Sequence, residues 1–306
     1  MNVLVLGGNG FIGSHIVDKL LEEGHKVRVF DKYEEHYRKP LARVEYCFGE
    51  FGNRGMLTES LKEIDVVFHL ISTTLPKTSN DDPAFDVKSN VIESIYLLEK
   101  CVENKVRKIV YVSSGGTIYG VPKILPVSED HFTSPLCSYG ICKLTIEKYL
   151  ALFKHLYGLD YVVLRLSNPY GERQNPLGIQ GAVSVFLGKV ARKETIEIWG
   201  DGEIVRDYIY VKDLVAGIYS AAILNTSSQV FNLGCGTALS LNSLLKIIQD
   251  VVGGDLRVRY SQQRSFDVPA IYLDITRAQN ELFWRPNTPI AVGIKKTWDF
   301  ISKIIP

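Results

Sequence analysis

Short runs of apolar, β-branched residues alternate with segments of helical period along the first half of the chain. The runs are nearly continuous, as in Val66–Leu70, and this is typical of strands that are covered on both faces. Strands that alternate with helices in this way predict a parallel sheet with crossover helices on both faces. The predicted strands are Asn2–Leu6, Lys26–Phe30, Val44–Phe48, Val66–Leu70, Lys108–Val112 and Tyr161–Arg165, and the predicted helices are Ile12–Glu23, Met56–Leu61, Phe85–Glu103 and Tyr139–Tyr157.

The rhythm changes after Asn168, where a stretch rich in proline and glycine is followed by shorter elements. We therefore expect residues 1–168 to form an α/β, Rossmann-type doubly wound parallel sheet that binds a ligand at the carboxyl ends of its strands. Residues 169–306 are expected to be mainly a smaller mixed α/β substrate-binding lobe over the carboxyl ends of the strands, where such sheets bind ligands. Segments near 205–234 are expected to return to the first domain. Helices predicted at Leu214–Leu224 and Leu241–Val252 can return to the core.

Composition narrows the function classes. The chain has 306 residues and a net charge of +1 without any block of like charges, so we expect neither a nucleic-acid partner nor a membrane surface. It lacks the roughly 20-residue apolar stretch that spans a bilayer and a leader-like start, which makes the cytoplasm the default location. Its five cysteines form no Cys-x-x-Cys pair and its six histidines are scattered. We expect reduced thiols and no metal.

The first candidate site is the glycine-rich segment Gly7-Gly8-Asn9-Gly10-Phe11-Ile12-Gly13, which joins the first predicted strand to the first predicted helix. Glycine permits a tight turn and close approach of the backbone to a pyrophosphate, while the helix start supplies free N–H groups. The second strand ends at Asp31, whose carboxylate can bind ribose hydroxyls and repel a 2′-phosphate. This favours NAD over NADP, although Lys32 can partly offset the repulsion.

The second candidate site is Tyr139-Gly140-Ile141-Cys142-Lys143. Its tyrosine and lysine are four residues apart in a predicted helix and therefore lie on one face. A tyrosine that acts as a base near pH 7 needs its pKa lowered by ~3 units, equivalent to ~4 kcal/mol, and a neighbouring cation can supply part of that. The pair predicts that Tyr139 removes a hydroxyl proton while a hydride leaves the same carbon for the nicotinamide.

With glycines spaced by three and Tyr139-x-x-x-Lys143, nearly the whole chain resembles the extended short-chain dehydrogenase/reductase family, in particular its NAD-dependent nucleotide-sugar epimerases and dehydratases. The resemblance implies a homodimer and a 4-epimerase acting on UDP-glucose and UDP-galactose or their N-acetyl forms through a 4-keto intermediate. Positions that match the family's cofactor contacts, besides the residues named above, are Glu50, Phe51, Leu70, Ile71, Asn90 and Ser113.

The turn before Tyr139 departs from the family pattern. The family places a catalytic Ser or Thr at the position of Gly115, which has no hydroxyl. Thr117 and Ser114 are two possible substitutes, and Thr117 is favoured if the backbone stays extended, because residues two apart share a side. Similar dehydratases carry Asp-Glu where Gly116 and Thr117 stand, so elimination is disfavoured. A decarboxylase, dehydratase, 4-keto reductase or silent dinucleotide sensor remains the alternative.

The resemblance also implies a substrate site. Asn168, Arg206 and Arg264 match residues that contact the diphosphate, Asp267 matches a ribose-binding carboxylate, and Val183 and Trp199 fall where the family encloses uracil. Ile271 stands where a larger residue often limits the size of the sugar, which favours acceptance of N-acetylated sugars. Similar enzymes dimerise through the helices that here carry Ile95, Leu98, Leu150 and Leu152, although the same apolar spacing fits packing on the sheet.

Overall fold

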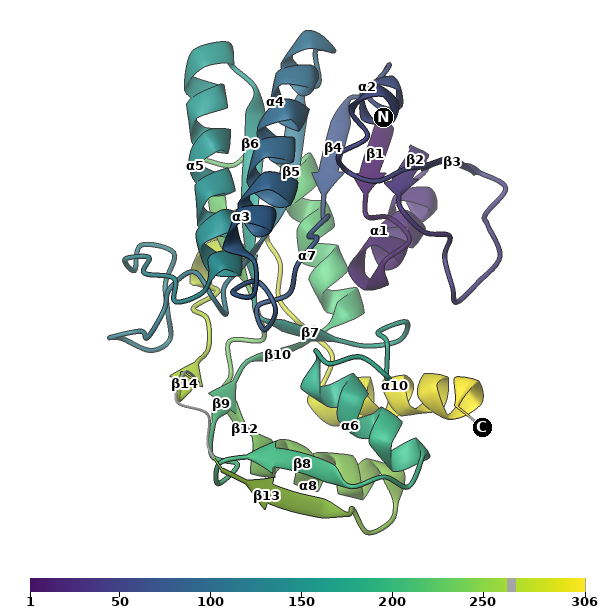
Figure 1. Cartoon of the computed structure of the whole chain (residues 1–306), viewed down its shortest axis with the longest axis vertical. Coiled ribbons are helices and arrows are strands. Elements are labelled where there is room, and N and C mark those ends of the chain that lie inside the picture. Colours follow the sequence, from purple (N-terminus) through teal and green to yellow (C-terminus); the bar gives the residue numbers. More distant parts are fainter. Residues whose placement is uncertain (263–267, 306) are drawn as a thin grey trace.

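The computed structural model describes residues 1–262 and 268–305, and a parallel sheet lies at the centre of this part. The sheet has seven strands, which pair in the order β11-β6-β5-β4-β1-β2-β3 (Figure 1). The predicted Rossmann-type sheet is confirmed, and the six predicted strands agree with the structure to within two residues at each end. The strands are β1 (Asn2–Leu6), β2 (Lys26–Asp31), β3 (Val44–Phe48), β4 (Val66–His69), β5 (Lys108–Ser114), β6 (Asp160–Leu166) and β11 (Val230–Leu233).

Helices cover both faces of this sheet (Figure 1). Successive side chains of a strand point to opposite faces, so Val3 and Val5 enter one apolar cluster while Leu4 and Leu6 enter the other. The first cluster includes residues of α1 (Phe11–Glu22) and α7 (Val211–Ile223), and the second includes residues of α2 (Arg54–Ser60), α4 (Glu93–Glu103) and α5 (Ser138–Tyr157). Full burial of each aliphatic side chain contributes about 1.5–3 kcal/mol, which fixes the register that carries the site.

The segment predicted as one regular helix over Phe85–Glu103 differs from the prediction. It consists of α3 (Pro83–Asp86), a π-helical segment η1 (Val87–Ile92) and then α4. Within it, the Asn90 side chain donates to the backbone oxygen of Asp86, 3.1 Å away. Apolar periodicity cannot reveal such a widened turn, and π-helical turns inside α-helices often mark functional sites.

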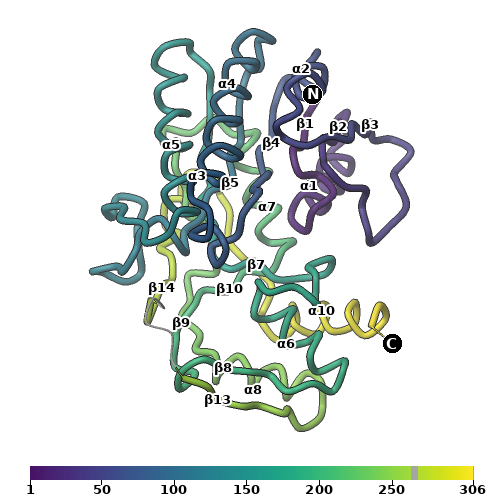
Figure 2. The backbone as a smooth tube through the Cα atoms, viewed as in Figure 1, coloured from purple at the N-terminus to yellow at the C-terminus, as the bar shows by residue number. Residues whose placement is uncertain are grey.

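A second group of elements lies beyond the carboxyl ends of the strands, at the bottom of Figure 2. There β7 pairs with β10, β8 with β13, and β9 with both β12 and β14. Leu241–Val252 is a helix as predicted, α8, but it packs against α10 in this group rather than on the large sheet. The bounds are β7 (Asn168–Tyr170), α6 (Ala182–Ala191), β8 (Ile196–Trp199), β9 (Val205–Arg206), β10 (Tyr208–Tyr210), β12 (Leu239–Ser240), α8, β13 (Val258–Ser261), β14 (Ala270–Ile271) and α10 (Ile290–Ile304). Helix α9 (Thr276–Glu281) packs instead against β11 of the large sheet.

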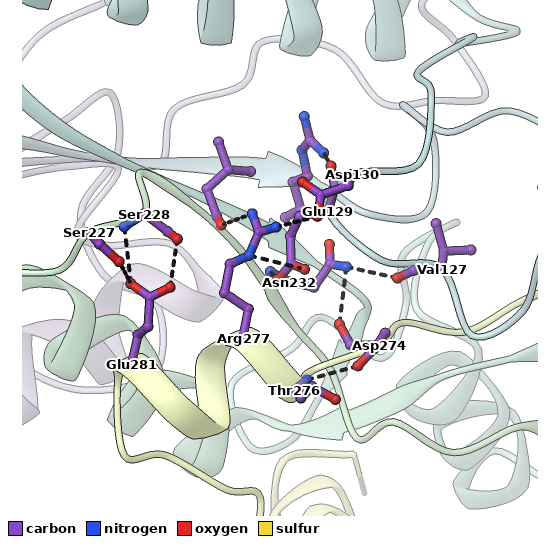
Figure 3. A network of polar contacts seen from close by, with 12 residues as sticks. Val127, Glu129, Asp130, Ser227, Ser228, Asn232, Asp274, Thr276, Arg277 and Glu281 are labelled. Carbon is purple, nitrogen blue, oxygen red and sulfur yellow. Dashed lines mark hydrogen bonds and ion pairs between the residues drawn. The ribbon is translucent and has the colours of Figure 1, made fainter.

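A polar network fastens the segment around β14 and α9 to the large sheet (Figure 3). Arg277 lies 2.7 Å from Asp130 and 3.7 Å from Glu129. Asn232 of β11 donates its amide hydrogens to the backbone oxygens of Val127 and Asp274. These contacts hold residues 270–277 against the end of the sheet where the candidate catalytic turn lies.

Three further observations bear on function. In the described residues, no helix is long and apolar enough to cross a membrane. The same residues contain no group of three or more His, Cys, Asp or Glu side chains arranged to hold a metal ion. All five cysteines are free thiols.

Candidate active site

The glycine turn after β1 has the geometry that its sequence predicts. Gly7 adopts a φ of +83°, a left-handed conformation that favours glycine. A Cβ on Gly13 would lie 2.0 Å from the backbone oxygen of Gly7, so helix α1 can approach the turn this closely only with glycine at that position. Gly10 caps the helix without a side-chain hydrogen bond, which leaves backbone N–H groups for an anion.

A cavity of about 810 Å³ opens beside this turn. The predicted cofactor residues that line it are Gly7, Gly10, Asp31, Lys32, Glu50, Phe51, Leu70 and Ile71. Phe11, Ile12 and Gly13 belong to the first turn of α1 and are not among the lining side chains. The cavity is also lined by four residues that the sequence did not reveal, Tyr33, Ser72, Thr73 and Phe85. Their positions after β2, after β4 and in α3 could have identified them.

The charges at the adenosine end of the cavity favour NAD. The carboxylate of Asp31 accepts hydrogen bonds from the backbone N–H groups of Asn9 and Tyr33, at 2.9 and 3.2 Å. The Lys32 ammonium lies 2.9 Å from Glu50, so a second carboxylate neutralises the cation that we expected to offset Asp31. A 2′-phosphate would therefore meet unbalanced negative charge, whereas ribose hydroxyls could donate to Asp31.

A small cavity of about 10 Å³ adjoins the cofactor cavity, with which it shares Ile71 and Ser72. Tyr139, Lys143 and Asn90 line it. Lys143 is buried, and its Nζ donates to the backbone oxygen of Val112 at 2.9 Å. The same nitrogen lies 5.6 Å from the centre of the Tyr139 ring. Helix α5 thus holds the cation beside the tyrosine, at the edge of the cavity that fits the cofactor.

Burial sets the protonation of this pair. It raises the pKa of Tyr139 to about 12, an effect that the Ser72 hydroxyl only partly offsets. It lowers the pKa of Lys143 to about 8, against the opposing effect of nearby carboxylates. Lys143 is therefore mostly charged at pH 7 while Tyr139 keeps its proton. In the protein alone, desolvation of the phenolate dominates the pKa of Tyr139. That Lys143 together with an oxidised nicotinamide favours the phenolate stays a prediction.

The turn before Tyr139 is not extended. The N–H groups of Thr117 and Ile118 point to the backbone oxygen of Ser114, at 3.5 and 3.3 Å. In a backbone that is not extended, residues two apart need not share a side, so this spacing no longer favours Thr117. The Thr117 Oγ1 is buried without a hydrogen-bond partner, and the choice between it and Ser114 stays a prediction.

The backbone position of Gly115 faces another part of the chain. A Cβ on this residue would lie 2.7 Å from the Cδ1 of Leu273, so the Leu273 side chain fills the space that a residue with a side chain would need. Leu273 in turn donates its N–H to Asp207. The loss of the usual hydroxyl at Gly115 therefore goes together with a close contact between the two parts of the chain.

Ser113 and Asn90 have roles that the sequence did not reveal. The Ser113 hydroxyl donates to buried Glu147, whose carboxylate lies 2.7 Å from Arg165, so the structure does not bring Ser113 to the cofactor cavity. Asn90 is also buried; its Oδ1 accepts from the Thr73 N–H and its Nδ2 donates to the Thr73 hydroxyl. Asn90 therefore holds the loop after β4 that lines the cavity.

A third cavity, of about 580 Å³, lies between the loop after β4 and the second group of elements. Asn168, Trp199 and Arg206 all line it. Arg206 donates to the backbone oxygens of Val205 and Val268, at 2.8 and 2.7 Å. Asn168 donates its amide to the backbone oxygen of Asp207 at 2.9 Å. These bonds fix both side chains at the cavity wall.

Other predicted substrate residues have different outcomes. Val183 is wholly buried in the core and does not line the cavity, whereas Ala182 and Val185 of the same helix do, because α6 turns the face that carries Val183 inward. Ile271 is also buried. Arg264 and Asp267 lie outside the described residues. Lys77 and Lys189, which the sequence did not reveal as site residues, bring two more positive charges to the cavity.

A glycine turn at a parallel sheet, a cavity that fits a dinucleotide and a Tyr-Lys pair beside it define a Rossmann-fold, dinucleotide-dependent enzyme. The chain belongs to the NAD dependent epimerase/dehydratase family, whose sequence model matches residues 3–234. It is 36% identical to the UDP-glucose 4-epimerase of Mycolicibacterium smegmatis over 98% of both chains. It is also 33% identical to a dTDP-4-dehydro-6-deoxyglucose reductase of Escherichia coli, over 96% of this chain and 95% of that protein. The crystal structure of a UDP-glucose 4-epimerase from Thermotoga maritima with UDP-glucose matches all of both chains with a TM-score of 0.94 and 38% identity.

Proposed function

We propose that this protein is an NAD-dependent 4-epimerase of a UDP-sugar, acting on UDP-glucose and UDP-galactose or their N-acetyl forms. The observation that carries the proposal is the Tyr139–Lys143 pair at the edge of the cofactor cavity, following a turn that contains no carboxylate. The epimerases among the similar proteins support the same reaction.

In this proposal, Tyr139 accepts the proton of the sugar's 4-hydroxyl and later returns it. To act as a base it must first lose its own proton to solvent, which burial opposes by raising its pKa to about 12. When bound, oxidised NAD would supply a nearby positive charge that favours this loss and would accept the C4 hydride reversibly. Lys143, held by the Val112 oxygen, adds a second positive charge behind the ring. Ser114 or Thr117 completes the set by binding the 4-hydroxyl.

Epimerisation requires the sugar to present both faces to the same groups, so the substrate must be held by a part that does not react. Arg206 and Asn168 are fixed at the wall of the 580 Å³ cavity by backbone contacts and are suited to bind a diphosphate. Arg264 and Asp267 are proposed to join them. A ligand anchored by its diphosphate leaves the sugar free to rotate.

The identity to a reductase of a 4-keto sugar makes that reaction the second candidate. The turn disfavours dehydration, because Gly116 and Thr117 stand where acid and base groups would be needed. Reduction of a 4-keto sugar would use the same Tyr139 and Lys143 but would consume a reduced cofactor. The two reactions therefore differ in their requirement for added cofactor.

The test incubates the purified protein with UDP-glucose, UDP-galactose, their N-acetyl forms and the corresponding dTDP-sugars, and follows the products by NMR. We expect interconversion of the 4-epimers without net consumption of NAD. Recovery of unchanged sugars from every incubation would contradict the enzyme assignment. Formation of a 4-keto-6-deoxy sugar would replace epimerisation by dehydration.

A homodimer and a cytoplasmic location are also proposed. Of the four apolar residues that suggested the dimer, Leu98 and Leu150 are buried in the chain's own core and Ile95 packs against it, whereas Leu152 is 43% exposed. Exposed Leu156 and Tyr157 on the same helix support a contact with a second copy. Light scattering after size exclusion tests the dimer. The free thiols support a reducing compartment such as the cytoplasm.

A further inference from the structure

A buried carboxylate lies beside the Tyr139–Lys143 pair. Asp86, at the end of α3, has no exposed surface and lines the small cavity together with Tyr139, Cys142 and Lys143. Because it is fully covered, it cannot touch a sugar bound in the open cavities. Any effect on the reaction must pass through its neighbours.

The hydrogen bonds of Asp86 are one-sided. Its Oδ1 accepts from the Thr74 hydroxyl at 2.6 Å and from the Asn90 amide at 2.8 Å. Its Oδ2 accepts no hydrogen bond from an N–H or O–H group, and the neutral Cys142 thiol also interacts with the carboxylate. Burial of a carboxylate without an ionic partner is costly, so the fold keeps this group at an energetic disadvantage. The neutral donors on Oδ1 fix the position of the group without cancelling its charge.

A second carboxylate near Lys143 provides the contrast. Glu147 follows Lys143 by one turn of α5, but it forms a buried ion pair with Arg165 and accepts from the Ser113 hydroxyl. Its negative charge is therefore largely balanced. Among the described residues Asp86 forms no ion pair with a cation, so its charge is not balanced in this way. Of the two carboxylates, Glu147 still raises the pKa of Lys143 more, and Asp86 raises it in the same direction.

We propose that Asp86 is a positioning residue whose uncompensated negative charge keeps the Lys143 ammonium protonated beside Tyr139. The effect on catalysis rests on the proposed function, whereas the effect of Asp86 on the charge of Lys143 does not. In the π-helical segment that follows Asp86, the Asn90 amide donates to the Asp86 carboxylate and holds it in place. Asp86, Asn90 and the loop after β4 thus form one support behind the catalytic pair.

The charges of the groups that face Lys143 are consistent with a role of Asp86 in keeping the ammonium protonated. Burial lowers the pKa of Lys143 to about 8, and Glu147, Asp86 and Cys142 act in the opposite direction. On β4, His69 stays neutral because burial lowers its pKa to about 3. On β5, Tyr111 is neutral and offers only its ring, 5.0 Å from the Lys143 Nζ. Asp86 also raises the pKa of Tyr139, so removal of its charge lowers the pKa of both members of the pair.

The test measures the titration of Lys143 itself. Protein labelled with ¹³C at the lysine ε-carbon is titrated by NMR without substrate, and the Lys143 signal is assigned by its absence from Lys143→Met. Asp86→Asn keeps the shape and the Oδ1 contacts but removes the charge, and we expect the midpoint of Lys143 to fall by about one pH unit. Asp82→Asn is the matched control, because Asp82 caps the same helix from an exposed position and should leave the midpoint unchanged.

Three further outcomes complete the test. Asp86→Glu retains the charge and should bring the midpoint back toward the wild-type value, which a purely structural role would not require. Asp86→Ser removes the same charge, and its Lys143 midpoint is measured instead if Asp86→Asn does not fold. An unchanged Lys143 midpoint in the charge-removing variants overturns the proposal. Because no substrate is used, failure of the 4-epimerase assignment does not affect the Lys143 titration. Where activity is measured, its alkaline limit should shift to lower pH in Asp86→Asn but not in Asp82→Asn.

Discussion

The cofactor cavity and the substrate cavity are built in different ways. Every residue that lines the first lies between Gly7 and Glu93, at or just after the ends of β1, β2, β3 and β4 or in the helical segment beginning at α3. The second collects residues from Lys77 to Leu241, on elements that approach only after the chain has folded. The first site therefore depends on local backbone geometry, and the second on the docking of the smaller group of elements against the sheet.

This difference predicts that the two sites respond separately to mutation. Changes at the strand ends should alter NAD binding and leave the affinity for the sugar nucleotide nearly unchanged. Changes at the third cavity should do the reverse. Tyr139 and Lys143 line neither of these two cavities, although the resemblance also places them among the cofactor contacts, so their replacement should affect mainly the chemical step.

The largest effect is expected for Tyr139→Phe. Loss of a positioned acid–base group lowers kcat by about 10²–10⁴-fold, whereas NAD content, measured after denaturation of the purified protein, should be retained. Tyr149→Phe on the same helix is the control and should keep wild-type activity. Full activity of Tyr139→Phe would remove the tyrosine from the mechanism.

Gly13→Ala should weaken the cofactor site next most strongly. The new methyl group would lie 2.0 Å from the Gly7 oxygen, so the turn and α1 must separate. Overpacking of this kind costs about 1–3 kcal/mol of unfolding free energy, and calorimetry should find NAD binding at least about tenfold weaker. Gly55→Ala, whose methyl group would meet only the Asn53 Oδ1 at 3.8 Å, is the matched control. Equal NAD affinity in both variants would disprove the role of the close approach.

Arg206→Ala tests the substrate side of the comparison. A hydrogen bond to a charged group contributes about 1.5–3 kcal/mol, so KM for the UDP-sugar should rise by about 10–100-fold. Titration should find the NAD affinity unchanged. Lys189→Ala, which removes a half-buried lysine of α6 at the same cavity, should have a much smaller effect. A parallel loss of NAD binding would show that the two sites are not independent.

Asp31→Ala is expected to produce the smallest of these effects, a change in cofactor preference. Removal of the carboxylate takes away both the ribose contact and the repulsion of a 2′-phosphate, so the ratio of NAD to NADP affinity should fall by about tenfold. Lys32→Ala is the comparison, and it should leave NADP excluded because Asp31 remains. If NADP binds Lys32→Ala as tightly as Asp31→Ala, then Asp31 does not set the preference.

The comparison also explains what the sequence could predict. Strand runs, the glycine turn and Tyr139-x-x-x-Lys143 are local patterns whose geometry follows from a few neighbouring residues. Three features depend on contacts between distant segments: the Leu273 side chain against Gly115, the burial of Val183, and the buried Asp86 carboxylate. No periodicity encodes them. The preference for Thr117 over Ser114 holds only if the backbone stays extended after Ser114, and the two glycines at that point do not enforce an extended backbone.

The most direct test of the central claim follows the hydrogen at C4 of the sugar. UDP-glucose that carries deuterium at C4 is incubated with the protein in ordinary water, and the products are examined by NMR and mass spectrometry. The account predicts UDP-galactose that retains the deuterium at C4, because Tyr139 moves only the hydroxyl proton and the C4 hydrogen returns to the same carbon. Product that has lost the label to solvent, or no conversion of UDP-glucose or its N-acetyl form, would contradict it.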